Sequence, residues 1–419
     1  MSERVVVIGQ GYVGLPVAVR AVEAGYDVVG LELNQTRVEG LAAGSSHVED
    51  IGDDRLRDAL DTGRYRPTSD ARDMAGFDIV VISVPTPMAE GAPDLSYIET
   101  AAATVARYLR PNATVILEST TYPGTTEELV APILEAGSGL KAGIDFHLGY
   151  SPERIDPGNA IWRLENTPKV VSGIDDSSLA KVQGFFDRIV ERTVAVSGTR
   201  EAELTKLLEN TFRHVNIALV NELAMFARDL GIDVWEAIDA ASTKPFGYMR
   251  FTPGPGVGGH CLPIDPSYLS WQVERSLGQT FRFVELANDV NSHMPDYVVR
   301  RIQSLLNDMQ RSVRGTTILL YGLAYKANTG DARETPSVPI AKRLVELGAV
   351  VSAADPHVDD HQFPVGVSRS AGDAADAAAA DLVVYLVDHD LFDHDAIVAA
   401  GTPILDCRHA LDGPNVQQL

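Results

Sequence analysis

One stretch near the N-terminus, residues 4–32, restricts the fold of this chain more than any other. The β-branched run RVVVI leads directly into GQGYVG, and a helical pattern and a second apolar run ending at Glu32 follow. Gly9, Gly11 and Gly14 have the spacing of a dinucleotide fingerprint. In that fingerprint the glycines make the turn, admit the pyrophosphate and let the helix meet the strand, while the acid takes the ribose hydroxyls. The stretch therefore predicts a Rossmann nucleotide-binding unit.

The acid at the end of the second run indicates which dinucleotide binds. Glu32 would repel a 2′-phosphate, so the sequence predicts NAD as the cofactor. Arg37 lies close by and keeps NADP open as an alternative, because an arginine near the ribose accommodates that phosphate. Tyr12 and Val13 belong to the glycine turn and are also expected to contact the cofactor.

Strand and helix patterns continue to alternate after this unit. The apolar runs FDIVVIS and TVILES are continuous, as strands of a parallel sheet covered on both faces require. Each run ends in hydroxyl residues and proline, at the edge where a doubly wound sheet binds its ligands. Ordinary helix capping is the alternative role for the Ser and Thr residues. The candidates for facing the cofactor there are Pro85, Thr86, Glu118 and Thr120.

Helical patterns replace this alternation beyond the first domain. The stretch 200–230 carries an apolar stripe at helical spacing, and Lys206 and Asn210 lie four residues apart on one face of it. The alternative interpretation is that these two side chains are solvated and have no role in a site. A second helical stretch covers 280–310. Two long helices bury little by themselves, so we expect a spine that also packs against a second subunit.

The alternation returns in the C-terminal part, where TTILLYGLA, AVVSAAD, DLVVYLV and TPILDC indicate a second parallel sheet. The turn after the first run is poor in glycine but rich in charged residues, which indicates a second nucleotide-like ligand held by side chains. Those charged residues are Lys326, Asp331, Arg333 and Glu334. The predicted fold is α/β, with two Rossmann-like doubly wound parallel-sheet domains joined by a long helical spine. The predicted domains are 1–197, 198–312 and 313–419.

The stretch PGPGVGGHCLPIDP (253–266) forms neither a helix nor a packed strand, because glycine and proline oppose both. We therefore expect a tight loop. Cys261 lies in its middle, beside His260 and four residues before Asp265. A thiol with neighbours that can lower its pKa or take its proton is typical of covalent catalysis. A buried, inert cysteine in an irregular turn is the alternative.

Charge and cysteine content exclude several classes of partner. The formal charge of −23 argues against nucleic acid and anionic membranes, so local cations and backbone donors must hold any phosphate-bearing ligand. Cys261 and Cys407 are the only cysteines, which fits a reducing cytoplasm and predicts no metal site. Cys407 lies in an expected strand and is interpreted as a packing residue. We find no signal peptide and no apolar run of about 18 residues that would span a membrane.

Seven motifs follow one another along the chain: GxGxxG, VPTP, ST near a Pro-Gly turn, SPE, K-x3-N, GGxC-x3-D and K-x4-D-x-R. With these motifs the chain resembles, end to end, the UDP-glucose/GDP-mannose dehydrogenase family. The resemblance implies oxidation of the C6 hydroxymethyl of a nucleotide-diphospho-sugar to a carboxylate, with two NAD⁺ and a covalent thiol intermediate. It also accounts for two nucleotide-binding sheets, one for NAD and one for the sugar nucleotide. We expect a homodimer or a higher homo-oligomer.

The resemblance also implies roles for single residues. The Cys261 thiolate would add to the aldehyde, forming a thiohemiacetal and then a thioester that water releases. Lys206 and Asn210 match the positions that stabilise the oxyanions formed on the way. Asp265 matches the carboxylate that orders the catalytic water together with a threonine, which is Thr120 in this chain.

The hydrolytic base is left open by a departure from the family pattern. Glu153 matches the first glutamate of the SPE loop, but Pro157 stands where a second glutamate is usual. The base is therefore Glu153, Asp156 or Asp265. The resemblance places Arg333 at the cofactor. Residues expected to contact the substrate are Glu153, Arg154, Lys206, Asn210, Arg250, Gly258, His260 and Lys326.

The sequence of the loop around the cysteine also indicates which sugar the substrate carries. Glucose enzymes usually have Ser and Lys where this chain has His260 and Ile264, and the GGHC pattern resembles the branch that acts on UDP-N-acetylhexosamines. Arg250 departs from that branch and is a candidate for binding phosphate or a neighbouring subunit. The expected substrate is UDP-N-acetylglucosamine or UDP-N-acetylmannosamine, with UDP-glucose or dTDP-glucose as the alternative.

Two other classes of function remain as alternatives. A single-step β-hydroxyacid dehydrogenase shares the first domain and the spine but needs neither Cys261 nor a third domain. A non-catalytic sugar-nucleotide sensor would keep both sheets but would gain nothing from Lys206, Asn210 and Cys261. The number of NADH molecules formed per sugar separates the three: two, one or none.

Overall fold

A computed structural model of the protein describes residues 2–89, 91–156, 159, 161–259, 262 and 264–419. The chain forms two compact units, which we call the first and the second unit. The first unit comprises Met1–Glu209 with Arg275–Leu277, and the second comprises Asn210–Glu274 with Gly278–Leu419. No helix in the described part of the chain is both long and apolar enough to cross a bilayer.

The first unit is built on an eight-stranded sheet of order β10-β9-β8-β7-β4-β1-β2-β3. All neighbouring strands are parallel except β8 and β9, which pair antiparallel. The six strands from β3 to β8 therefore have the order of a doubly wound Rossmann sheet. The strands are β1 (Arg4–Ile8), β2 (Asp27–Leu31), β3 (Tyr65–Thr68), β4 (Ile79–Ile82), β7 (Thr114–Leu117), β8 (His147–Tyr150), β9 (Lys169–Gly173) and β10 (Thr193–Ala195).

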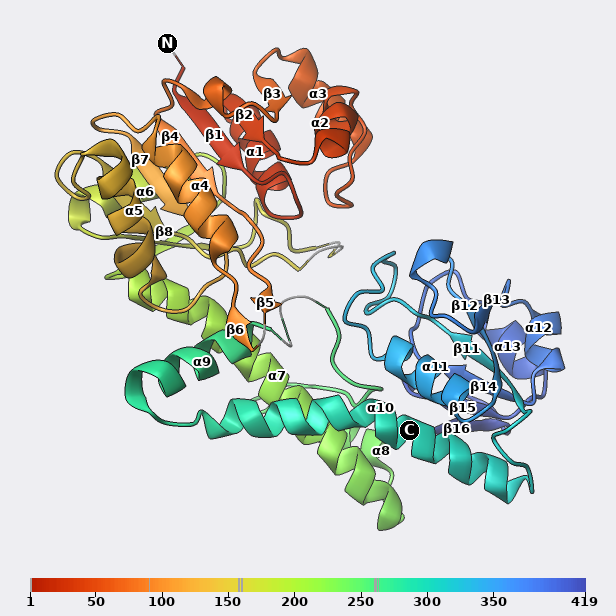
Figure 1. The fold of residues 1–419 in the computed structure, drawn as a ribbon. Coiled ribbons are helices and arrows are strands. Elements are labelled where there is room, and N and C mark those ends of the chain that lie inside the picture. Colours follow the sequence, from red (N-terminus) through yellow and green to blue (C-terminus); the bar gives the residue numbers. More distant parts are fainter. Residues whose placement is uncertain (1, 90, 157–158, 160, 260–261, 263) are drawn as a thin grey trace. The chain divides into compact units, whose positions relative to one another are not determined.

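Both faces of this sheet are covered by helices, as the continuous apolar runs require. One core lies between the sheet and α1 (Gly14–Glu23), α3 (Asp53–Asp61) and α6 (Asp176–Phe186). The other lies under α4 (Ser96–Ala106) and α5 (Ala131–Ser138), which are neighbours in Figure 1.

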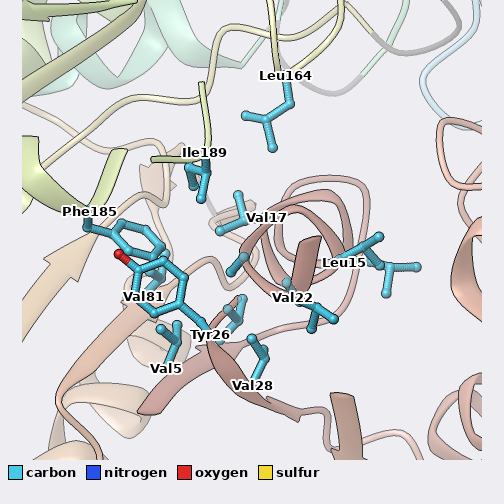
Figure 2. Packing of buried hydrophobic residues seen from close by; sticks show 14 of the residues in the cluster. Val5, Leu15, Val17, Val22, Tyr26, Val28, Val81, Leu164, Phe185 and Ile189 are labelled. Atoms are coloured by element: carbon cyan, nitrogen blue, oxygen red, sulfur yellow. The ribbon is translucent and has the colours of Figure 1, made fainter. Parts of the chain in front are cut away.

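The core of the α1 face is closed by aromatic rings. Figure 2 shows Tyr26 and Phe185 next to the strand residues Val5 and Val81. The centroids of the two rings are 5.5 Å apart, and all four side chains are buried. This packing fixes α6 against the sheet, although β10 and α6 come more than a hundred residues after β1.

Smaller elements complete the first unit. They are α2 (Gln35–Ala42), the 3-10 turn η1 (Ala71–Met74), the short strands β5 (Met88–Ala89) and β6 (Ala92–Pro93), and the π-helical turn η2 (Thr126–Val130). The π-helical turn leads directly into α5. Turns of this kind are frequent at functional sites.

The helical part of the chain contains α7 (Thr199–Asp229), α8 (Val234–Ser242), α9 (Asp265–Leu277) and α10 (Arg282–Asp308). Within the second unit, α7 and α10 are joined by buried polar contacts. His214 Nε2 lies 2.8 Å from Asn288 Oδ1, and the amide of Asn221 donates to Asn291 Oδ1 at 2.9 Å. These contacts set the register of two helices whose apolar stripes alone would allow sliding.

The second unit contains a six-stranded, fully parallel sheet of order β13-β12-β11-β14-β15-β16. Figure 1 shows α11 beside its strands, and α10 contributes Met294, Val298 and Ile302 to the same core. Cys407 is buried in that core, which confirms its role in packing. The elements are β11 (Thr317–Tyr321), α11 (Ser337–Glu346), β12 (Val350–Ala354), η3 (Asp360–Gln362), β13 (Val367–Arg369), α12 (Ala374–Ala379), β14 (Leu382–Tyr385), α13 (His394–Ala399), β15 (Ile404–Asp406) and β16 (Val416–Gln418).

The predicted fold class is confirmed by these two sheets. Each has the strand order 3-2-1-4-5-6 when its first six strands are numbered along the chain, apart from the small strands β5 and β6. The continuous apolar runs of the sequence became the central strands in both. The long helices α7 and α10 supply the predicted helical segment, which lies between the two sheets in the order of the chain.

Candidate active site

The glycine turn after β1 is shaped for a ligand. Gly9 has φ +88°, and a Cβ on it would lie 2.5 Å from the carbonyl oxygen of Ser83. A Cβ on Gly14 would lie 1.8 Å from the carbonyl oxygen of Gly9, so helix and turn touch there. A Cβ on Gly11 would meet no described atom within 4 Å. The middle glycine therefore faces open space, where a pyrophosphate can approach the backbone.

The N-terminus of α1 is the second part of this turn. Tyr12 and Val13 precede the helix, and Val13 is its N-cap residue. Among the described residues no side chain caps this helix, so its first N–H groups are not satisfied by a capping side chain. Uncapped N–H groups and the helix dipole together favour a negative ligand, and the residues present thus fit a dinucleotide.

Glu32 lies at the carboxyl end of β2, as predicted, and is nearly buried. Its two carboxylate oxygens accept hydrogen bonds from Gln10 N at 3.2 Å and Asn34 N at 2.9 Å. Arg37 Nη1 lies 3.8 Å from Glu32 Oε2. The structure thus brings together the two side chains that the sequence assigned to opposite cofactor preferences, and Arg37 is paired with the acid.

The loops after β4 and β7 lie side by side at the same sheet edge. The Thr86 hydroxyl donates to the carbonyl oxygen of Thr120 at 2.8 Å, and the Ser119 hydroxyl donates to that of Val84 at 2.8 Å. Pro85 lies in the first of these loops and is exposed. The hydroxyl residues predicted to face the cofactor therefore join the two loops to each other.

Glu118 occupies a different place from the one predicted. Its side chain is fully buried, and its Oε1 pairs with the ammonium of Lys169 at the start of β9. The prediction that Glu118 faces the cofactor is wrong, because a side chain enclosed by protein has no surface to offer a ligand. The same ammonium lies 2.7 Å from Glu153 Oε2, so Lys169 bridges two carboxylates.

Glu153 is held from several sides. Its Oε1 accepts hydrogen bonds from the backbone N–H groups of Arg154 and Ile155, and its own carbonyl oxygen accepts from Lys206 Nζ at 2.6 Å. Burial opposes ionisation of Glu153, but Lys169, Lys206 and the backbone donors outweigh burial, so its pKa lies below the usual range. The SPE loop is therefore fixed around a buried carboxylate.

Two further predicted residues lie near this loop. Lys206 is buried on α7, and its ammonium reaches the loop as described above. Arg154 turns its guanidinium to Glu209, with Nη2 2.6 Å from Oε1, and to the carbonyl oxygen of Pro168 at 2.6 Å. Asp156 accepts a hydrogen bond from the Asn159 amide at 3.2 Å.

The second unit holds the other half of the predicted catalytic set. Asp265 is the first residue of α9 and is buried. Its Oδ2 accepts a hydrogen bond of 2.6 Å from the Asn210 amide on α7. The structure thus joins two residues, 55 positions apart, that were predicted separately.

The glycine-rich loop before Cys261 packs on the charged turn after β11. A Cβ on Gly258 would lie 2.9 Å from both Tyr325 Cβ and the carbonyl oxygen of Glu334, and Gly259 N donates to that oxygen at 3.3 Å. A hollow of about 360 Å³ lies beside this contact. Its wall includes Val257, Asn291, Glu334 and Pro336. Glycine is needed here because the two loops meet backbone to backbone.

Further predicted ligand residues also lie in the second unit. Lys326 follows β11 in the charged turn and is half-buried. Arg333 is exposed and forms a bidentate pair with Asp331, at 2.9 and 2.8 Å. Arg250 is exposed and paired with Asp239 on α8. His260 and Cys261, on which the covalent chemistry depends, lie outside the described residues.

Three buried charged groups were missed from the sequence. Lys169 opens an apolar strand, and a cation at the start of a buried run was the signal for a buried partner. Glu203, three residues before Lys206, accepts from Thr126 N at 2.9 Å and Thr126 Oγ1 at 2.7 Å. Asp355, after β12, accepts from His389 Nε2 at 3.1 Å and from Leu323 N at 2.7 Å.

Comparison with known proteins gives the family. The NAD binding domain of the UDP-glucose/GDP-mannose dehydrogenase family matches residues 3–216, its central domain matches 200–293, and its UDP binding domain matches 319–413. The chain belongs to the UDP-glucose/GDP-mannose dehydrogenase family. It is thus an NAD-dependent nucleotide-sugar dehydrogenase, with its NAD binding domain in the first sheet and its UDP binding domain in the second.

Relatives within the family are similar over nearly the whole chain. The UDP-N-acetyl-D-mannosamine dehydrogenase of Pyrococcus horikoshii is 34% identical over 93% of this chain and 90% of its own length. The UDP-N-acetyl-D-glucosamine 6-dehydrogenase of Pseudomonas aeruginosa is 36% identical over 87% and 86%. A solved structure of the UDP-D-ManNAc dehydrogenase from P. horikoshii superposes with a TM-score of 0.90 and 33% identity, covering 99% of this chain and 98% of that one.

Proposed function

We propose that this member of the family oxidises the C6 hydroxymethyl of a UDP-N-acetylhexosamine to a carboxylate through a thioester on Cys261. The observation that carries the proposal is the 2.6 Å hydrogen bond between Asn210 and Asp265. It ties a buried amide on α7 to the first residue of α9, four positions after Cys261 in sequence. The cysteine loop thus leads directly into a fixed pair of polar side chains.

The chemistry needs a thiol because an aldehyde has no second hydride to give until a nucleophile adds to its carbonyl carbon. NAD⁺, when bound, accepts one hydride in each of two oxidations. The Cys261 thiolate adds to the aldehyde carbon, and the resulting alkoxide becomes a thioester carbonyl as the second hydride leaves. Water then breaks the C–S bond, giving the carboxylate and returning the thiol. A thiol of this kind requires a reducing compartment, which we propose is the cytoplasm.

Lys206 and Asn210 are proposed to stabilise the alkoxides on this path. Both are buried, and they lie four residues apart on α7, so their side chains leave the helix on one side. A buried ammonium and a buried amide donate strong hydrogen bonds to an oxyanion because little water competes.

We assign the hydrolytic base to Asp265. Glu153, the second candidate, already accepts hydrogen bonds at both carboxylate oxygens and is enclosed by the SPE loop. A carboxylate with both oxygens engaged is a poor acceptor for the proton of an attacking water. Asp156, the third candidate, is half-buried and accepts a hydrogen bond from Asn159 of the same loop.

The sugar is proposed from the GGHC sequence of the loop and from the names of the relatives, which are dehydrogenases of UDP-N-acetylmannosamine and UDP-N-acetylglucosamine. UDP-glucose or dTDP-glucose, which would give the nucleotide-glucuronate, is the alternative. The residues proposed to contact the cofactor are Tyr12, Val13, Pro85, Thr86, Thr120, Arg37 and Arg333. Those proposed to contact the substrate are Arg154, Arg250, Gly258, His260 and Lys326.

A panel of the four nucleotide sugars tests the proposal, with NADH measured by absorbance and the acid measured by mass. We expect two NADH per sugar with at least one UDP-N-acetylhexosamine. Cys261→Ser is expected to abolish acid formation but to retain NAD binding. Formation of one NADH per sugar, or full activity of Cys261→Ser, would rule out the covalent two-step route.

We also propose a homodimer that forms through α7. Leu219, Leu223 and Phe226 are 45–54% exposed and are spaced by four and three residues, which places them on one face of the helix; Leu230, directly after the end of the helix, is 72% exposed. An apolar face of this size on a monomer is usually an interaction surface. A second copy of the same face is the simplest occupant, since a two-fold axis pairs like with like.

A further inference from the structure

The strongest unexplained feature of the first unit is the carboxylate of Glu118. It and Glu153 share the single ammonium of Lys169, and all three side chains are at least nine-tenths buried. Glu153 alone would neutralise Lys169. A second carboxylate on the same ammonium adds another negative charge to the protein interior, where the next cation, Lys206, lies against Glu153 and not against Glu118; burying this charge is unfavourable unless another interaction makes use of it.

The two carboxylates differ in how they are satisfied. Both oxygens of Glu153 accept hydrogen bonds, from Lys169 and from the two following backbone N–H groups. Oε2 of Glu118, by contrast, has no hydrogen-bond partner among the described residues. Of the two carboxylates, Glu118 is the one with a buried oxygen that is not saturated.

A continuous line of contacts leads from Glu118 to Lys206. Glu118 pairs with Lys169, and Lys169 Nζ donates to Glu153 Oε2 at 2.7 Å. The Glu153 carbonyl oxygen then accepts from Lys206 Nζ at 2.6 Å. Each link comes from a different element, since the residues follow β7, open β9, follow β8 and lie on α7.

We propose that Glu118 is a positioning residue that, through Lys169 and the SPE turn, holds the Lys206 ammonium in place for the reaction. The proposal rests on the proposed function, in which Lys206 stabilises the alkoxides. Glu118 itself touches neither sugar nor cofactor. Its charge fixes Lys169, Lys169 fixes the Glu153 side chain, and the Glu153 backbone sets the distance that Lys206 spans.

The line of contacts depends on the ionisation of Glu118. Burial raises the pKa of Glu118 to about 7; Lys169 opposes this rise, and the nearby Glu153 adds to it. The charged groups that face Glu118 are Lys169 from β9 and Glu153 from the loop after β8, with Lys206 one contact further. Above neutral pH the charged Glu118 therefore holds Lys169 firmly, and below it the protonated form does so weakly.

The experiment compares the pH dependence of kcat in the full-length wild type and in Glu118→Gln, with the best nucleotide sugar of the panel and NAD⁺ at saturation. For the wild type we expect kcat to rise through about pH 7. In Glu118→Gln this rise should disappear and kcat at pH 8 should fall about tenfold, with both KM values within about twofold of the wild type. Any contribution of the Cys261 thiol is common to both proteins, so the difference between the two pH profiles reports Glu118.

Glu203→Gln is the matched control, because burial raises the pKa of Glu203 to about 7 as well. Its carboxylate serves the loop at Thr126 and is no part of the line of contacts. The rise through pH 7 should persist in this variant. If the rise persists in Glu118→Gln, or is lost only in Glu203→Gln, the proposal is wrong.

Two outcomes are kept apart by this design. A wild type that forms no NADH with any sugar overturns the proposed function before any variant is made. An active wild type with an unaltered profile in Glu118→Gln overturns only the role of Glu118. Should Glu118→Gln not fold, Glu118→Asp keeps a carboxyl group but shortens it, and an apparent pKa unchanged from that of the wild type would again contradict the proposal.

Discussion

The amide of Asn210 donates a 2.6 Å hydrogen bond to Asp265 Oδ2 and so ties the middle of α7 to the first residue of α9. Both side chains are buried. A buried carboxylate must be paired or bonded, and Asn210 supplies one donor without neutralising the charge. The bond fixes the position of the carboxyl group that we propose as the base.

If Asp265 is the base of thioester hydrolysis, Asp265→Asn should complete both oxidations but release the acid slowly. We expect a rapid burst of about two NADH per subunit, followed by a steady rate reduced at least about 100-fold. Stopped-flow absorbance measures the burst, and mass spectrometry of the quenched enzyme detects the trapped acyl group. Asp289→Asn, an exposed carboxylate on α10, is the control and should show no burst. If Asp265→Asn shows no burst, Asp265 acts in a step that precedes formation of the thioester.

Glu32 is expected to set the choice between NAD and NADP. Glu32→Ser removes the acceptor for the ribose hydroxyls and leaves Arg37 without its 3.8 Å partner. The loss of hydrogen bonds to a charged group should lower kcat/KM for NAD by about 10–100-fold. Activity with NADP should rise, because Arg37 is then available to a 2′-phosphate.

Arg37 provides the internal control for this change of cofactor preference. In the double variant Glu32→Ser/Arg37→Ala the gain with NADP should be lost, while the weakened use of NAD should stay. Steady-state kinetics with both cofactors measures the difference. An equal gain with NADP in the single and double variants would show that repulsion by Glu32 alone sets the preference.

The exposed face of α7 is expected to carry the subunit contact. Replacing Leu223 and Phe226 with Glu places two charges in a surface that two copies would bury, so the dimer should dissociate into monomers. Light scattering coupled to size exclusion measures the mass at several concentrations. Val365→Glu, at a residue 95% exposed in the second unit, is the control and should keep the wild-type mass. An unchanged mass in the Leu223/Phe226 variant would place the interface elsewhere.

Asp355 should make stability depend on pH at the acidic end. Burial opposes its ionisation, but hydrogen bonds from His389 and from backbone N–H groups, including that of Ala324, outweigh burial and hold its pKa below the ordinary 3.8. The stabilisation is complete above that ordinary value and is lost as the pH falls through the lower folded-state pKa.

Asp355→Asn tests this contribution. We expect the free energy of unfolding at pH 7 to fall by about 2–3 kcal/mol, because backbone donors lose a charged acceptor. The difference between variant and wild type should shrink below about pH 4. Urea unfolding at a series of pH values measures it, and Asp390→Asn, an exposed neighbour of His389 in sequence, is the control. If the difference in unfolding free energy does not change with pH, the packing of the Asp355 side chain, and not its charge, stabilises the fold.

The sequence alone determined the local features of this protein. Continuous apolar runs predicted the buried parallel strands, because a strand covered on both faces has no polar side. The fingerprint predicted the turn at Gly9 to Gly14 and the acid at Glu32, because backbone geometry there permits few residues. The order of motifs predicted the family, which the comparisons confirmed.

Only the tertiary structure decided which charges meet. Glu118 and Glu153 follow neighbouring strands, but their sharing of Lys169 depends on β9 pairing antiparallel with β8. The bond from Asn210 to Asp265 depends likewise on how α9 begins beside α7. Hydrophobic periodicity fixes which face of an element is buried, whereas the partner of a buried charge is set by the packing of elements distant in sequence.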